Sequence, residues 1–185
     1  MNILDILEKG LHRHGVERTQ AALGDRSAYV GLSDIGKAAD CLRAAVANKI
    51  SVQAESSLEN QLRLHRGHWF ESGVADAFKA AGVPFLHQLA ISTVHNGVPV
   101  KGHLDFVFIG PNGEIQVIEL KSCEQLPDTA YASYEMQVYG QLGLLESLWN
   151  TPSFALFDGE APTNFPALVK REFNVTLPKQ AVISG

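Results

Sequence analysis

Residues 100–121 contain two runs rich in β-branched and aromatic residues, separated by the sequence Gly-Pro-Asn-Gly at 110–113. This composition is typical of two antiparallel strands joined by a turn. A loop made only of Asn112 and Gly113 would force Pro111 to pair within the sheet, where it has no N–H to donate. We therefore expect residues 110–114 to form the loop, which fixes how the two strands pair.

The expected hairpin brings charged residues together. With the loop at 110–114, Asp105 lies opposite Glu119 and His103 lies opposite Lys121. Side chains alternate between the two faces of a strand, so Glu119 and Lys121 share one face. Directly opposed residues in a sheet have Cβ atoms about 4.5–5.5 Å apart. The hairpin therefore places two carboxylates and one ammonium group within reach of one another.

Two opposed carboxylates repel each other, and a purely structural sheet gains little from them. A hard divalent cation gives a reason for the pair, because Mg²⁺ binds proteins through one or two carboxylates together with water and phosphate oxygens. The alternative is a solvated sheet face on which Glu119 and Lys121 form an ordinary ion pair. Strand periodicity alone does not separate these two interpretations.

A third carboxylate, Glu71, lies within the apolar stripe of a helix expected at 57–81. The other members of this stripe are Leu64, Gly67, Val74 and Phe78. Such a stripe faces the sheet, where a glutamate is costly to bury unless it is charge-paired or bound to a metal. The alternative is a glutamate at the edge of the stripe that reaches solvent.

The helix expected at 129–149 carries amides on its core-facing stripe. Gln137 lies on this stripe with Tyr134, Gln141, Leu144 and Leu148. Buried amides need hydrogen-bond partners, which a bound phosphate, a water at a metal or an ordinary structural contact would each provide. Gln137 is therefore a candidate for a functional or a structural role.

The remaining patterns predict a single mixed α/β domain over residues 1–185, with a small central sheet flanked by helices. Helices are expected at 3–13, at 33–49 with Ser33 as N-cap, at 57–81 and at 129–149, and strands at 85–94, 100–109, 115–121, 154–157 and 172–177. Residues 1–50 then form an N-terminal helical segment, and residues 57–150 contain the core of the candidate site.

The bulk composition is that of an ordinary globular protein, with 45% hydrophobic and 19% charged residues. No apolar run reaches about 18 residues and the first residues lack the layout of a signal peptide, so we expect no membrane partner and a cytoplasmic location. The net charge of −5 argues mildly against a nucleic-acid partner, because non-specific DNA affinity comes from basic surface. A local basic groove would nevertheless be enough.

Taken together, these residues resemble the motifs of the PD-(D/E)XK nuclease superfamily. The motifs are Gly67-His68-Trp69-Phe70-Glu71, Gly102-His103-Leu104-Asp105, Glu119-Leu120-Lys121 and Gln137, with thirteen residues between Asp105 and Glu119. The resemblance covers about residues 33–145 and is greatest to the RecB-like exonucleases, which include CRISPR-associated and phage λ-type enzymes. It implies a restriction-endonuclease-like fold.

The resemblance also implies a role for each acidic residue. Asp105 and Glu119 would bind Mg²⁺ or Mn²⁺, and the Leu120 carbonyl would complete the ligand set. Glu71 would be an acidic ligand or would orient the water at the metal. Lys121 would position the attacking water and stabilise the negative charge that develops in the transition state.

Gln137 agrees with the family's pattern, as the helical glutamine that supports the site, whereas two other features depart from it. Many RecB-like proteins have a histidine where this chain has Glu71, although glutamate also occurs in the superfamily. Residues 33–43 resemble a segment whose cysteine, in the CRISPR-associated branch, joins three later cysteines on an iron–sulfur cluster. No cysteine follows Cys123, so we expect no such cluster and interpret Cys41 as a small buried residue.

The expected activity is that of a metal-dependent exonuclease on single- or double-stranded DNA, in phage or bacterial recombination, repair or processing. Three alternatives stay open: a restriction-like or junction-resolving endonuclease of the same superfamily, a non-catalytic DNA-binding or assembly protein, and a protein that binds a small phosphorylated metabolite. A homo-oligomer, including a ring, and recombination or CRISPR-type partner proteins also stay open. Candidate DNA contacts are Lys37, Arg43, Arg63 and Arg66, although exposed basic residues are more often only solvated.

Overall fold

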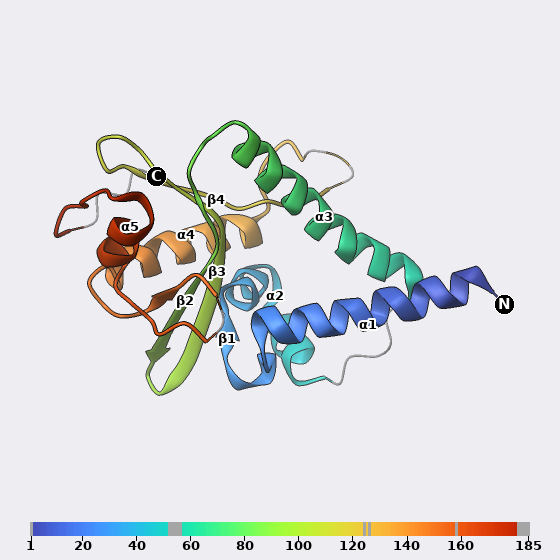
Figure 1. Cartoon of the computed structure of the whole chain (residues 1–185). Coiled ribbons are helices and arrows are strands. Elements are labelled where there is room, and N and C mark those ends of the chain that lie inside the picture. The colour runs from blue at the N-terminus through green and yellow to red at the C-terminus, as the bar shows by residue number, and fades with distance from the viewer. Residues whose placement is uncertain (1, 52–56, 124, 126, 158, 181–185) are drawn as a thin grey trace.

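The computed structural model describes residues 2–51, 57–123, 125, 127–157 and 159–180, with the side chains of residues 18–23 excepted. The helices are α1 (Ile3–Leu23), α2 (Leu32–Ile50), α3 (Leu58–Ala80), α4 (Ala132–Ser147) and α5 (Phe165–Phe173), with a 3₁₀ turn η1 (Arg26–Ala28). The strands are β1 (Val30–Gly31), β2 (Leu86–His95), β3 (Val98–Ile109), β4 (Ile115–Ile118) and β5 (Phe154–Ala155). The expected mixed α/β architecture, a small open sheet flanked by helices, is confirmed (Figure 1).

The sheet has the order β1-β3-β2-β5, and β4 also pairs with β3. Strand β2 runs antiparallel to almost the whole length of β3 and occupies one of its edges. On the other edge, β1 pairs in parallel with Val100 and Lys101, while β4 pairs with residues 106–109. Residues 102–105 of β3 therefore lie between two strand partners and pair with neither, within the described part of the chain.

The predicted hairpin register is confirmed as far as the ladder extends. Ile109 pairs with Ile115, and the Gly110 N–H donates to the Glu114 carbonyl across the loop at 2.8 Å. The last pair is Phe106 with Ile118, so the expected strand 115–121 is three residues too long. Beyond it the Leu120 N–H donates to the Asp105 carboxylate at 2.8 Å. This side-chain acceptor draws the chain away from the β3 backbone.

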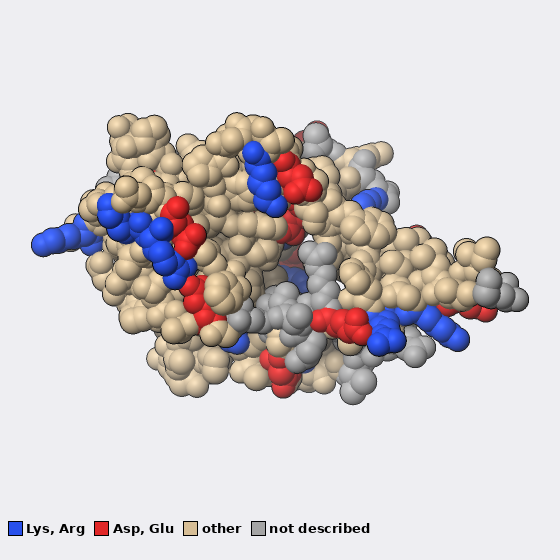
Figure 2. All heavy atoms as spheres, in the orientation of Figure 1, with Lys and Arg blue, Asp and Glu red and all other residues tan. Residues whose placement is uncertain are grey.

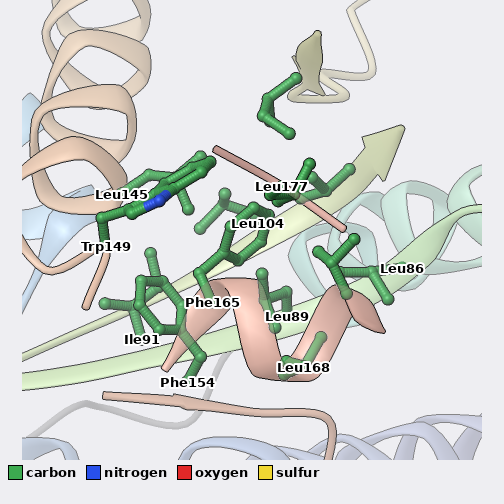
Figure 3. Close-up of a cluster of buried hydrophobic side chains, with 13 residues drawn as sticks. Leu86, Leu89, Ile91, Leu104, Leu145, Trp149, Phe154, Phe165, Leu168 and Leu177 are labelled. Carbon is green, nitrogen blue, oxygen red and sulfur yellow. The ribbon is translucent and has the colours of Figure 1, made fainter. Parts of the chain in front are cut away.

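Helices α4 and α5 cover one face of the sheet and enclose the main hydrophobic core. Leu145 and Trp149 come from α4 and the turn after it, and Phe165 and Leu168 from α5. All four pack around sheet residues such as Leu104 (Figure 3). Each of these side chains is at most 2% exposed, so truncating one would cost about 2–5 kcal/mol. This core holds β2 and β3 firmly beneath the candidate site.

Helix α3 covers the opposite face through an aromatic cluster. The Phe78 ring makes edge-to-face contacts with the rings of Phe85, Phe106 and Phe108, at centroid distances of 5.0–5.7 Å. Such pairs add about 0.5–1.5 kcal/mol each to the free energy gained by burial. The expected apolar stripe is therefore confirmed at this end of α3, whereas Leu64 is 65% exposed and lies outside it.

The N-terminal part of the chain forms an arm. Helix α1 packs against α3 and extends away from the sheet to the N-terminus (Figure 1). It runs ten residues beyond the expected end at residue 13. Its apolar side chains Ile3, Leu4, Ile6 and Leu7 are 43–72% exposed. The apolar face of this end of the helix is therefore not buried against the described residues of the chain.

Two predictions about secondary structure near the C-terminus are wrong or only partly right. The expected strand 172–177 is absent: residues up to Phe173 belong to α5, and Leu177 packs into the core without forming a strand. Asn164 caps this helix by accepting from the Ala167 N–H at 2.8 Å, and Pro166 occupies its first turn. The strand expected at 154–157 is confirmed only at Phe154–Ala155.

Two predictions about α2 are also wrong. Its N-cap is Gly31, not Ser33, and the Asp34 carboxylate accepts from the Gly31 N–H at 3.0 Å. Cys41 is exposed, not buried, and its backbone has non-helical angles that kink the helix. Helix α2 packs closely on α4 at Gly36. A Cβ at this position would lie 2.6 Å from the Ser133 carbonyl oxygen, so the close approach requires glycine.

Candidate metal centre and adjoining cavity

Asp105 lies at the fork where the chain after β4 separates from β3. One carboxylate oxygen accepts from the Leu120 N–H at 2.8 Å, and the other accepts from the Gln88 amide at 3.1 Å. Because residues 102–105 of β3 have no strand partner on this edge, the Asp105 side chain can face both α3 and the segment after β4. The fork thus turns a strand carboxylate into the centre of a polar cluster.

Glu119 is held near Asp105 by Lys121 and by two amides of α4. One carboxylate oxygen accepts from the Lys121 ammonium at 2.5 Å and from the Gln137 amide at 2.7 Å. The other accepts from the Gln141 amide at 2.7 Å. The Glu119 side chain is only 6% exposed, and its position is therefore well determined before any ligand arrives.

The Lys121 ammonium is fixed by three groups. Besides Glu119, it donates to the Gln137 side-chain oxygen at 3.1 Å and lies 5.5 Å from the centroid of the Tyr134 ring. The side chain remains 31% exposed. Gln137 thus bridges the ammonium and the carboxylate, which gives the predicted helical glutamine a supporting position at the site.

Glu71 reaches the cluster from α3 and is 12% exposed, so it does not extend into solvent. One of its oxygens makes hydrogen bonds with the His87 ring at 2.7 Å and the Gln88 amide at 2.6 Å. Gly67, one turn earlier on α3, faces Ser122: a Cβ there would lie 3.6 Å from the Ser122 hydroxyl oxygen. Helix α3 therefore packs beside the segment that carries Lys121.

The three carboxylates influence one another electrostatically. Burial raises the pKa of Asp105 to about 7, and the negative charges of Glu119 and Glu71 act in the same direction. The hydrogen bond from the Leu120 N–H and the positive charge of Lys121 oppose this shift. Without a cation, the anionic form of Asp105 is therefore disfavoured.

The donor set fits a hard divalent cation. Asp105 and Glu119 are adjacent, partly or largely buried, and mutually repulsive, which a cation between them would relieve. The Leu120 carbonyl belongs to the same segment. Among the described residues, however, no group of three or more His, Cys, Asp and Glu side chains is arranged to hold a metal ion. The fit therefore rests on the two carboxylates.

A cavity of ≈ 220 Å³ opens beside this pair, at the gap between β1 and β4. Its lining joins Asp105, Glu119, Lys121 and Gln137 to Arg26, Tyr29, Ser33, Lys101 and His103. Lys101, His103 and Asp105 alternate along β3 and so face the same side. Glu71 is not part of this lining.

The expected DNA contacts are not brought to this cavity. Lys37, Arg43, Arg63 and Arg66 are exposed on α2 and α3, and none lines it. In the view of Figure 2, basic and acidic side chains lie beside one another and form no continuous basic face. Among the described residues, the basic side chains that line the cavity with Asp105 and Glu119 are Lys121, Lys101 and Arg26.

Arg26 and Lys101 are held by neighbours at the edge of the cavity. The Arg26 guanidinium donates to Asp34 at 3.1 Å, and the Lys101 ammonium lies 4.9 Å from the centroid of the Tyr29 ring. Sequence reasoning missed both residues. A signal existed for Lys101, because residues 101, 103 and 105 of the expected strand 100–109 lie on the same face. No comparable signal existed for Arg26, which lies outside the helices and strands expected from the sequence.

No protein-family model matches this sequence, and comparison with curated proteins finds no match either. Within the part of the chain that the structure describes, every helix is too short or too polar to cross a bilayer. The functional interpretation therefore depends on the geometry of the site.

Proposed function

We propose that the chain is a metal-dependent deoxyribonuclease with a PD-(D/E)XK-type site on a restriction-endonuclease-like fold, and that it acts as an exonuclease. The observation that supports this most strongly is the grouping of Asp105, Glu119 and Lys121 at the fork of β3 and β4. All three line one cavity, together with the basic residues Arg26 and Lys101. Carboxylates and fixed cations around one cavity suit a phosphodiester substrate.

A divalent cation, Mg²⁺ or Mn²⁺, would be held by Asp105, Glu119 and the Leu120 carbonyl. When bound, it would supply a Lewis acid that lowers the pKa of water and offsets charge on the phosphate. Asp105 must be deprotonated to take part. Lys121, Gln137 and Gln141 already orient both oxygens of Glu119.

Lys121 would stabilise the transition state directly. Hydrolysis adds a water oxygen to phosphorus, breaks one P–O bond and places negative charge on the phosphoryl oxygens and on the leaving oxygen. An ammonium held by Glu119 and Gln137 meets this charge without reorganising. A charge fixed in this way typically contributes a hundredfold or more to the rate, by analogy with roughly 10²–10³ for one oxyanion donor.

The test is degradation of linear DNA in Mn²⁺ by the wild type and Lys121→Ala. The variant should lose cleavage by at least about a hundredfold and retain Mn²⁺ binding measured by calorimetry. Lys79→Ala is the matched control, since the Lys79 side chain is 65% exposed on α3 and forms an ion pair with Asp76. It should cleave like the wild type.

Two substrates separate the related activities. Linear single- and double-stranded DNA shortened from its ends supports the exonuclease, whereas nicking of circular DNA would assign an endonuclease instead. Full activity in Lys121→Ala would refute the mechanism. DNA binding without any Mn²⁺-dependent cleavage by the wild type would identify a non-catalytic binding protein.

A further inference from the structure

Gln88 has an unusual backbone for a residue in a strand. Its φ angle is +54°, in the left-handed region, although it is not glycine. This costs roughly 1 kcal/mol. The adjacent pairs His87 with Phe106 and Leu89 with Leu104 continue the ladder on either side, but Gln88 and Asp105 make no ladder pair. The irregularity is therefore confined to the position beside Asp105.

The left-handed residue changes which way the strand faces. Leu86 and Leu89 both lie in the hydrophobic core although they are three residues apart, whereas a regular strand returns to the same face every two residues. The extra step lets both leucines remain buried while Gln88 is directed towards α3. Backbone strain at this point thus delivers a side chain to the candidate metal centre.

The Gln88 amide fills the space between two like-charged carboxylates. Its nitrogen donates to Glu71 at 2.6 Å and to Asp105 at 3.1 Å. An amide nitrogen has two protons, and this geometry uses both. The reverse orientation would place the amide oxygen between two carboxylates, which is repulsive, so the donor orientation is the one the network requires.

The space between Asp105 and Glu119 differs from the space between Glu71 and Asp105. In the hydrogen-bonding network of the described residues, the donors to Glu119 come from Lys121 and α4, and none of them also bonds Asp105. Both carboxylates border the cavity, whereas Glu71 and Gln88 do not. One carboxylate gap is thus open to a ligand from the cavity, and the other is closed by an amide.

We propose that Gln88 takes the place of a second cation, so that this chain binds one divalent ion between Asp105 and Glu119 and uses Glu71 as a positioning residue. The inference rests on the proposed function. The neutral amide links Glu71 to Asp105 and holds the Asp105 carboxylate in place. A second cation bound to these carboxylates and to two further ligands would have the same effect. A carboxylate at position 88 would remove the donor and supply an additional oxygen ligand.

The experiment counts Mn²⁺ ions per chain at pH 8 in the full-length protein without DNA, by calorimetry and by electron paramagnetic resonance of the unbound ion. The wild type should bind one ion. Gln88→Glu should bind two, and Gln88→Glu combined with Glu71→Gln should return to one. Gln116→Glu is the matched control, because it makes the same charge change at an exposed position of β4 and should leave the count at one.

The outcomes separate this inference from the proposed function. Two bound ions in the wild type would overturn the role of Gln88 and leave the nuclease proposal intact. A folded Gln88→Glu variant that binds only one ion would have the same consequence. If Gln88→Glu fails to fold, the wild-type count still decides. A wild type that degrades DNA only with a divalent ion and binds one ion supports both. A wild type that binds no Mn²⁺ overturns both.

Discussion

Asp105 carries a stability cost in the metal-free protein that follows from its surroundings. Burial and the charges of Glu119 and Glu71 raise its pKa to about 7, against an ordinary value near 3.8. The folded state therefore binds a proton more tightly than the unfolded state. The stability that this proton contributes is complete below about pH 4 and is lost as the pH rises through about 7.

Replacing Asp105 with asparagine should remove this pH dependence. We expect the difference in melting temperature between Asp105→Asn and the metal-free wild type to grow in favour of the variant from pH 5 to pH 8, because only the wild type acquires a buried negative charge. Thermal unfolding in the presence of a chelator measures it. Using the difference between the two proteins also removes the contributions of Asp34 and Glu160, whose carboxyl pKa values are lowered and which both proteins share. A constant difference across this range would contradict the prediction.

At the scale of elements, the gap between β1 and β4 on one edge of β3 creates the cavity. Strand β1 brings Gly31 and the nearby Arg26 to one side, and the segment after β4 brings Lys121 to the other. On the part of the β3 edge between β1 and β4, the Gln141 amide of α4 donates to the His103 carbonyl at 3.2 Å. The same α4 amide holds Glu119, so helix packing and site geometry depend on each other.

Lys101→Ala should weaken DNA binding more than Lys37→Ala. Lys101 borders the cavity on β3, whereas Lys37 is exposed on α2 outside it. If Lys101 contacts one phosphate, its loss should reduce the slope of log affinity against log salt by about 1. Fluorescence anisotropy over a salt series, with Ca²⁺ in place of Mn²⁺ to prevent cleavage, measures both affinity and slope. Equal effects in the two variants would place the DNA elsewhere.

Two glycines in helices should respond in opposite ways to alanine. In α2, a Cβ at Gly36 would lie 2.6 Å from the Ser133 carbonyl oxygen, so Gly36→Ala must separate α2 from α4 and should cost about 1–3 kcal/mol of unfolding free energy. In α3, Gly73 has open space around its Cβ position, and Gly73→Ala should stabilise by about 0.5–1 kcal/mol. Urea unfolding of both variants tests the pair. A stable Gly36→Ala would mean that the two helices are not in close contact.

At the scale of the whole molecule, metal binding and folding should be coupled. An ion that binds only the folded chain stabilises it by about 2.7 kcal/mol at 100 times its dissociation constant. For a chain of this length the melting temperature should then rise by about 5–10 °C at pH 8. Asp105→Asn should abolish this shift while remaining folded. A similar shift in that variant would show that Mn²⁺ binds elsewhere.

Several features of the site could be predicted from local pattern. The hairpin and its register follow from the turn sequence and strand periodicity, which together made Asp105 and Glu119 neighbours. The apolar stripe of α3 predicted that Glu71 faces inward. The amides Gln137 and Gln141 lie on the core-facing stripe that helical periodicity gave for α4. Each of these is a property of residues close in sequence, where backbone geometry fixes which side chains share a face.

Other features depend on contacts between distant segments. The end of β4 at Ile118 is set by the bond from the Leu120 N–H to Asp105, and the left-handed Gln88 by what lies on both faces of β2. Arg26 and Lys101 come together because β1 pairs in parallel with β3. Sequence by itself therefore determined which carboxylates and amides share a face of a strand or helix. Tertiary structure decided their partners, because hydrogen bonds and charge interactions act through space between elements that no local periodicity relates.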